Sequence, residues 1–128
     1  MRILVVLALL GSACHGSKSR LECNLRYAST TQRVGVAPVA EPYDAPLIDV
    51  GGRFAFKAVL RETPAAARSI SLYAYERGAR GDVLLQQLKY APPYPGTQPT
   101  AEFGFTGHQF VYSSDAREFE YWCTLSSP

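Results

Sequence analysis

Beyond Arg20, apolar and polar side chains alternate in short runs that glycine and proline interrupt. A period of two places successive side chains on opposite faces of a β-strand, so each run predicts a strand with one buried face. The runs lie at 21–28, 53–62, 69–76, 101–105, 108–113 and 118–125. About six to eight short strands predict an all-β fold, which is either a small antiparallel sandwich or a barrel.

The alternation also assigns an inward face to each run. The side chains expected in the core are Leu21, Cys23, Leu25 and Tyr27, then Phe54, Phe56, Ala58 and Leu60, then Ile70, Leu72 and Ala74, then Ala101, Phe103 and Phe105, then Phe110 and Tyr112, and finally Phe119, Tyr121, Cys123 and Leu125. Tyr73 and Tyr75 fall on the opposite face of their strand, and Glu118 and Glu120 do so in the last strand.

Two other segments allow more than one interpretation. The stretch VLLQQLKY at 83–90 is either the return strand of a hairpin with the loop ERGARGD, or a short helix capped by Asp82. Its length and the glycines at 78 and 81 favour the strand. Thr63 as a cap and Pro64 at the first helical position predict one helical turn at 63–67.

Prolines mark two segments without periodicity. The chain from 31 to 52 contains three prolines and is expected to be irregular. The tract APPYPGTQPT at 91–100 contains four and is expected to be a stiff, extended loop, because proline cannot donate a ladder hydrogen bond.

The first residues have the pattern of a secretory signal peptide. Arg2 is followed by an unbroken apolar run at 3–10 and by the small residues Gly11, Ser12 and Ala13. The run is too short to cross a bilayer, which needs ~20 apolar residues. We therefore expect residues 1–13 to be removed and the remaining chain, which is near the commonest domain size, to form one domain at 21–128.

The stretch LGSAC, Leu10 to Cys14, resembles the lipobox of bacterial lipoproteins, with Gly11 where that family prefers leucine. The resemblance implies cleavage before Cys14, a diacylglyceryl group on its sulfur and a polar tether at 14–20. His15 stands where aspartate retains such proteins at the inner membrane, so the resemblance implies outer-membrane anchoring in a host that has two membranes. The alternative is ordinary cleavage near Ala13, which would leave a soluble periplasmic or secreted protein.

The cysteine count is odd, which requires an explanation in an exported protein. A lipid on Cys14 leaves Cys23 and Cys123 as one pair, and an oxidising compartment favours a disulfide between them. Tyr121 and Cys123 also resemble the Tyr-x-Cys of immunoglobulin domains, although no tryptophan follows Cys23 at a short distance. That resemblance covers three residues and implies only an immunoglobulin-like sandwich architecture.

The sequence offers little for catalysis, metal binding or cofactor binding. The formal net charge is +2 without a basic cluster, which gives no basis for nucleic-acid binding. His108 is the only histidine beyond the tether, so we expect no metal and no cofactor. A catalytic triad would need His108 with a carboxylate such as Asp115, but no nucleophile elbow is present, and a turn or edge histidine is favoured. Glu118 and Glu120 could serve glycoside hydrolysis, although alternating acidic residues more often form a solvated face.

The best surface candidates are tyrosines, which are enriched at recognition surfaces. We predict partner binding by Tyr73, Tyr75, Tyr90 and Tyr94; the alternative for the first two is a strand buried on both faces. The expected function is a non-enzymatic envelope protein that binds a protein partner or assists assembly. Two alternatives stay open: an inhibitor of an external hydrolase such as lysozyme, and a small glycan-directed hydrolase or lectin.

Overall fold

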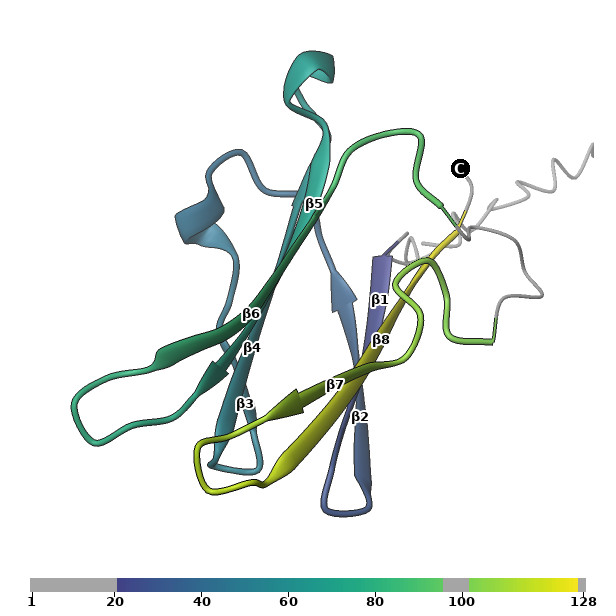
Figure 1. Ribbon diagram of the computed structural model, residues 1–128. Coiled ribbons are helices and arrows are strands. Elements are labelled where there is room, and N and C mark those ends of the chain that lie inside the picture. The colour runs from purple at the N-terminus through teal and green to yellow at the C-terminus, as the bar shows by residue number, and fades with distance from the viewer. Residues whose placement is uncertain (1–20, 96–101, 127–128) are drawn as a thin grey trace, which may run out of the picture.

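The computed structural model describes residues 21–95 and 102–126, and within them the chain forms eight strands and two 3-10 turns (Figure 1). The strands are β1 (Leu21–Tyr27), β2 (Thr30–Val36), β3 (Ile48–Val50), β4 (Phe54–Arg61), β5 (Ser69–Glu76), β6 (Val83–Tyr90), β7 (Gln109–Tyr112) and β8 (Glu118–Leu125); the 3-10 turns are η1 (Pro42–Asp44) and η2 (Ala65–Ala67). The predictions for the signal peptide, Cys14 and the tether lie outside the described residues.

The strands form two antiparallel four-stranded sheets that pack as a sandwich, which confirms the predicted fold class. Sheet A has the order β2-β1-β8-β7, and sheet B has the order β3-β4-β5-β6. Glutamine side chains connect the edges of the two sheets. Gln86 on β6 donates to Gln109 on β7 at 3.1 Å, and Gln32 on β2 donates to the carbonyl of Asp49 on β3 at 3.1 Å.

The first and last strands are neighbours, and the predicted disulfide joins them. Cys23 lies directly opposite Cys123 in the β1–β8 ladder, with their Cα atoms 4.1 Å apart, and both side chains are fully buried. The bridge therefore lies within sheet A, whereas immunoglobulin domains use a bridge between sheets. Tyr121 also differs from a tyrosine corner, because its hydroxyl donates to the Gln86 side chain of the other sheet at 2.7 Å. The likeness to immunoglobulin domains is one of architecture alone.

The core between the sheets is built around an aromatic cluster. The ring of Phe119 contacts those of Phe54 and Phe56, with centroids 5.4 and 6.3 Å apart, and Phe56 lies 4.9 Å from Tyr121. These four side chains are at most 1% exposed, and burying a side chain of this size stabilises the fold by ~1.5–3 kcal/mol. The inward faces predicted for β4, β5 and β8 are confirmed, as are Leu21, Cys23 and Leu25 of β1.

The predicted inward face of 108–113 is wrong. Val111 points into the core and is 3% exposed, whereas Phe110 and Tyr112 are 45% and 59% exposed. In the ladder Val111 lies opposite the buried Phe119, which fixes the orientation of the whole strand. Three apolar residues in succession do not show which face is buried, so pairing with β8 decides it.

The strand predicted at 101–105 is also wrong. The described part of this run, from Glu102 onward, forms turns with one bridge between Gly104 and Cys123. Gly104 has a φ of +63°, and an extended strand does not pass through this left-handed conformation. Phe105 is nevertheless buried, because its N–H donates to the Cys123 carbonyl at 3.1 Å and holds the turn on sheet A.

The segments 63–67 and 83–90 form the predicted turn and strand, whereas 31–52 contains more regular structure than predicted. The stretch 83–90 is strand β6, and one helical turn, η2, follows Pro64, although no side chain caps it. The segment 31–52 is not wholly irregular: it contains most of β2 and all of β3, with the prolines confined to the connection between them. That connection stays close to sheet B, since Val39 donates its N–H to the Leu60 carbonyl at 2.9 Å.

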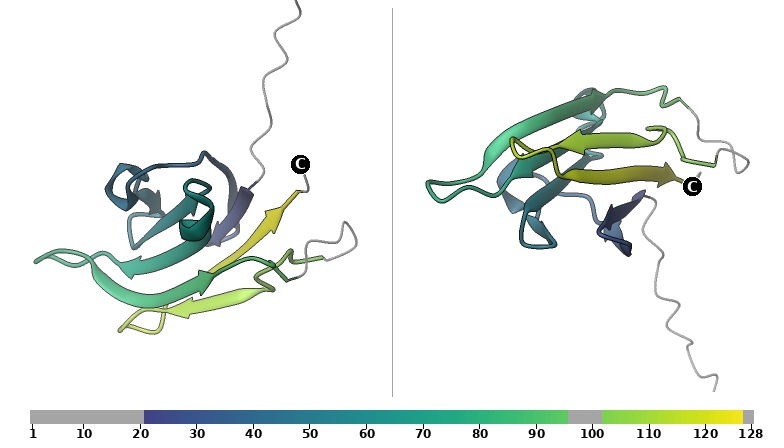
Figure 2. Two further views of the ribbon diagram at one scale, coloured as in Figure 1. Left: turned by 90° about the horizontal axis from the view of Figure 1, so that it is seen from above. Right: turned by 60° about the horizontal axis from the view of Figure 1, so that its bottom comes forward.

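The sandwich has two different ends. The turns β1–β2, β3–β4, β5–β6 and β7–β8 gather at one end, whereas β1 starts and β8 finishes at the other (Figures 1 and 2). Within the described residues, no helix has the length and apolar character needed to cross a bilayer.

Candidate binding surface

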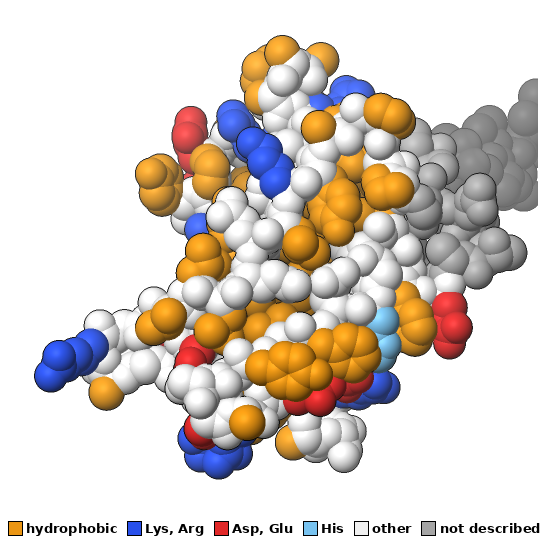
Figure 3. All heavy atoms as spheres, viewed as in Figure 1, with side chains coloured by type: hydrophobic (Ala, Val, Ile, Leu, Met, Phe, Trp, Pro, Cys, Tyr) orange, Lys and Arg blue, Asp and Glu red, His pale blue; other side chains and the backbone are white. Residues whose placement is uncertain are grey.

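The outer side of sheet A carries aromatic side chains where an antiparallel sandwich usually exposes polar ones. We call this surface the aromatic face and define it by Phe103, His108, Phe110, Tyr112 and Trp122. The side chains of β7 and β8 reach it because they alternate outward from the buried Val111, Tyr121 and Cys123. Figure 3 shows hydrophobic side chains on both sides of the pale-blue histidine, which is His108, with carboxylates beneath them.

The rings of the aromatic face hold one another in place. The imidazole of His108 lies between Phe103 and Phe110, with centroid distances of 4.4 and 4.3 Å. Trp122 contacts Phe103 and His108 edge to face at 5.6 and 5.4 Å. Such edge and offset contacts are the favoured arrangements of aromatic pairs. The surface is therefore ordered before any ligand arrives, and Phe110 and Tyr112 remain open to solvent.

A charged network lies against these rings. The Arg26 guanidinium donates two hydrogen bonds to the Glu120 carboxylate, at 2.6 and 2.8 Å, and sits 5.5 Å from the centre of the Trp122 ring. His108 Nε2 lies 3.0 Å from the same carboxylate, and the two form an ion pair when the imidazole is protonated. The hydrogen bonds from Arg26 hold the pKa of Glu120 below its usual value and raise that of Arg26.

A polar hollow of about 560 Å³ adjoins the aromatic face at the end where the turns gather. It is open to solvent, and the residues that line it are Arg26, Ala28, Ser29, Thr31, Glu118 and Glu120. Glu118 is exposed and lies directly opposite Tyr112 in the β7–β8 ladder. Among the described residues, no cationic side chain lies within ion-pair distance of Glu118, so its charge is not neutralised by a direct partner.

Tyr73 and Tyr75 lie on the outer side of sheet B, as predicted. Their rings stack with centroids 6.3 Å apart and planes 16° apart, and both are half-buried. Burial raises the pKa of Tyr75. The neighbouring strand β4 is buried on both faces, because Ala55 and Val59 on its outer side are also buried. Burial on both faces, which was the alternative considered for the tyrosine strand, thus describes β4. A role for the tyrosine pair in partner binding stays a prediction.

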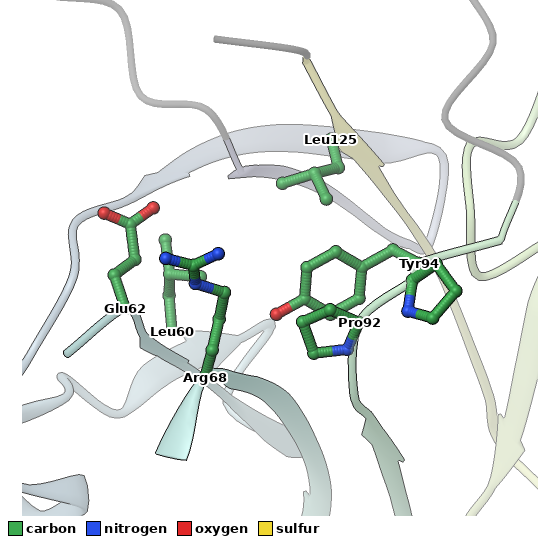
Figure 4. A pocket seen from close by; sticks show the side chains of 7 residues that line it. Leu60, Glu62, Arg68, Pro92, Tyr94 and Leu125 are labelled. Carbon is green, nitrogen blue, oxygen red and sulfur yellow. The ribbon is translucent and has the colours of Figure 1, made fainter. Parts of the chain in front are cut away.

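Tyr90 and Tyr94 lie elsewhere, so the structure does not bring the four predicted tyrosines together. Both pack against the buried Phe105, at centroid distances of 5.1 and 6.4 Å. Tyr94 projects into a hollow of about 180 Å³ between the sheets, with its hydroxyl directed toward the side occupied by Arg68 (Figure 4). Burial raises the pKa of Tyr90. These two tyrosines therefore take part in packing at the edge of the core.

The residues considered for catalysis do not assemble into a catalytic group. Asp115 accepts hydrogen bonds from Ser113 and Arg117 in the β7–β8 turn, which hold its pKa low, while His108 faces Glu120 instead. His108 is the turn histidine just before edge strand β7, where it was expected. No three metal-binding side chains cluster within the described parts of the chain.

Comparison with protein-family models, curated proteins and solved structures finds no match to this chain.

Proposed function

We propose that this protein is an exported, lipid-anchored, non-enzymatic module of the bacterial envelope that binds a protein partner through the aromatic face. The observation that carries the proposal is the pair of exposed rings, Phe110 and Tyr112, on a rigid aromatic cluster with a charged border. Large exposed apolar side chains rimmed by polar groups are typical of protein interaction sites.

The composition of this surface supports a protein partner. Tyrosine, tryptophan, phenylalanine and arginine are the residues enriched at interfaces and among the side chains that dominate binding energy. The ring contacts of His108 and the Arg26–Glu120 pair fix the surrounding side chains, so binding would cost little additional conformational entropy. An inhibitor of an external hydrolase is a special case of this proposal, since the hydrolase would be the partner.

The proposed anchor agrees with the arrangement of the domain. A lipid on Cys14 and a tether at 14–20 would join the domain at the start of β1, which is the end opposite the turns (Figure 1). The polar hollow beside the β1–β2 turn would then face away from the membrane. A binding surface at that end would be reachable by an envelope protein while the lipid is inserted.

The state of Glu120 supports a non-enzymatic function. The general acid of a glycoside hydrolase needs a raised pKa so that it is protonated near neutral pH. Here the hydrogen bonds from Arg26 lower the pKa of Glu120 instead. Glu120 is therefore poorly suited to act as the general acid of a catalytic pair with Glu118.

Intact-mass analysis of the native protein tests the anchor. We expect a chain that starts at Cys14 and carries both the lipid and one disulfide. A Cys14→Ser variant should leave the membrane fraction and keep its circular-dichroism spectrum, because the substituted residue precedes the folded domain. Retention of Cys14→Ser in the membrane fraction would contradict lipid anchoring.

Co-sedimentation with isolated envelopes tests the binding surface. The full chain with Cys14→Ser should sediment with envelopes of the source bacterium, and protease treatment of the envelopes should abolish this. Adding Phe110→Ala and Tyr112→Ala should weaken sedimentation by about tenfold or more, as expected for central interface residues. The matched control is Tyr43→Ala with Leu84→Ala, which changes two exposed apolar side chains outside sheet A. Equal sedimentation of the two double variants would reject the aromatic face as the binding site.

A further inference from the structure

The outer side of sheet A contains a repeated arrangement of ring and carboxylate. In the ladder, Glu120 of β8 has Arg26 of β1 on one side and Phe110 of β7 on the other. The guanidinium of Arg26 fills the space beside Glu120 and lies over the Trp122 ring. Arg26 thus joins the Glu120 carboxylate of its own row to the Trp122 ring of the adjacent row, where Trp122 lies opposite Asn24. This combines a bidentate hydrogen bond with a cation–π contact.

The next row along the strands has the same carboxylate and ring but no cation. Glu118 lies opposite Tyr112 of β7, as Glu120 lies opposite Phe110. Continuing the β1–β8 register by two residues brings Ala28 to the position that corresponds to Arg26. The chain turns there, with φ values of +49° at Ala28 and +69° at Ser29, and presents short side chains. The polar hollow occupies this place.

We propose that the hollow binds a cationic side chain of the protein partner, with arginine preferred over lysine. The guanidinium would pair with the Glu118 carboxylate from the place beside Ala28, as Arg26 pairs with Glu120 from β1. Tyr112 lies on the other side of Glu118. Arginine is preferred because its planar fork matches a carboxylate with two hydrogen bonds. This inference rests on the proposed function, since it names the chemistry of the partner at the same surface.

Charge complementarity supports a cation. On the outer side of sheet A, Arg26 is paired with Glu120, and Arg33 lies 4.0 Å from Glu22. Arg26 also interacts electrostatically with Glu118. Of the charged side chains that line the hollow, Glu118 and Glu120 are carboxylates and Arg26 is cationic, which leaves an excess of negative charge. A neutral glycan could stack on the rings but would leave that charge unbalanced, whereas a cationic side chain neutralises it. Preferential binding of a neutral glycan would therefore refute the inference.

Titration of tryptophan fluorescence tests the inference directly, because Trp122 is the single tryptophan of the chain and contacts Arg26 at the hollow. The probes are an end-blocked tetra-arginine peptide, the corresponding tetra-lysine and tetra-glutamate peptides, and chitohexaose as a neutral glycan. The protein is the full chain with Cys14→Ser. We expect saturable binding of tetra-arginine, weaker binding of tetra-lysine and none of the other two, with affinity falling as salt is added.

Variants identify the carboxylate responsible. Glu118→Gln removes one exposed charge and should weaken tetra-arginine binding by about two- to fivefold, the effect expected of a solvent-exposed ion pair. Glu22→Gln, which changes a carboxylate on the same face that already has Arg33 beside it, is the matched control and should have little effect. Equal affinities of these two variants, absence of tetra-arginine binding, or tighter binding of chitohexaose would each overturn the inference.

The envelope assay separates failure of this inference from failure of the proposed function. If Phe110→Ala with Tyr112→Ala abolishes envelope binding but Glu118→Gln and competing tetra-arginine do not, the aromatic face binds a partner by other chemistry. If the double aromatic variant sediments like the parent protein, the proposed function fails, and this inference fails with it.

Discussion

Removing the Cys23–Cys123 disulfide should destabilise the fold mainly by freeing the unfolded chain. The two cysteines are 100 residues apart, and the chain-entropy model assigns closure of a loop of that length ~4.7 kcal/mol at 25 °C. In the folded state the β1–β8 ladder already places the two residues opposite each other, so the bridge adds little constraint there. We expect Cys23→Ala with Cys123→Ala to lose ~3–5 kcal/mol of unfolding free energy.

Alanine is the appropriate replacement because both sulfur atoms are fully buried. Serine would place two hydroxyl groups in the core at a cost of ~1–3 kcal/mol for each one left unpaired, which would obscure the effect of the bridge. A typical domain has a total stability of ~5–15 kcal/mol, so the double variant should fold but unfold at much lower urea concentration.

Urea denaturation followed by circular dichroism measures this effect. With an m-value of ~1–2 kcal/mol/M, the urea midpoint should fall by ~1.5–5 M. The m-value itself should rise in the double variant, because an unfolded chain without the bridge exposes more surface. A loss below ~1 kcal/mol with an unchanged m-value would refute the reasoning, since it would show that the bridge does not restrict the unfolded chain.

Three further predictions concern single positions. Gly104→Ala should destabilise the fold by at least ~1 kcal/mol more than Gly107→Ala in urea denaturation, because both have positive φ but only at Gly104 would a Cβ overlap a backbone carbonyl. Burial raises the pKa of Tyr121 in the folded protein above its pKa of ~10 in the unfolded chain, so the neutral phenol stabilises the fold below pH ~10 and this stabilisation is lost as the pH rises further. Tyr121→Phe should therefore reduce the fall in the urea midpoint between pH 9 and 11. Arg26→Ala should raise the pKa of Glu120 in an NMR titration. In the parent protein the lowered pKa of Glu120 stabilises the fold above the unfolded-state pKa of ~4.5, and this stabilisation is lost as the pH falls. The stability of the variant should therefore decrease less below pH ~4.5. An unchanged Glu120 pKa would contradict the assigned role of the Arg26 hydrogen bonds.

The alternation of apolar and polar residues correctly predicted the strands in which one face is apolar and the other is polar. In β8, four buried side chains alternate with polar or outward ones, and the same contrast fixes β5. It failed at 108–113, where Phe110, Val111 and Tyr112 are all apolar. Only pairing with β8 over Val111 and Phe119 decides which side of that strand is buried. The pattern therefore placed Phe110 and Tyr112, the two exposed rings of the aromatic face, in the core.

The aromatic face could not be assembled from local pattern. Its members come from the turn before Phe105, the residue before β7, β7 itself and β8, and it also depends on Arg26 of β1. Pairing of β1 with β8 across almost the whole chain brings Arg26 to Glu120. One local signal was present. Trp122 alternates outward from the buried Tyr121 and Cys123, and an outward tryptophan on a sandwich strand indicates a surface with a partner or a cover.

The disulfide could be predicted from the number of cysteines that remain once Cys14 is assigned to a lipid, together with the face of the strand on which each of the two others lies. That Cys23 and Cys123 fall on inward faces follows from alternation, but their position opposite each other within one sheet does not. The strand order β2-β1-β8-β7 places the first and last strands side by side, and no local feature of 21–27 or 118–125 specifies that neighbour.

The position of the hollow limits which partners can reach it. With a lipid on Cys14, the seven residues of the tether span at most ~25 Å, at ~3.3–3.6 Å per residue. Strand β8 has eight residues and runs the length of the domain, which adds ~26 Å between the end where β1 starts and the Glu118 end. The hollow could therefore stand up to ~50 Å from the bilayer surface, beyond the Debye length of ~8–10 Å over which lipid head groups act. The charge that Glu118 meets would then come from a protein that extends into the envelope, which is the chemistry that tetra-arginine is chosen to imitate.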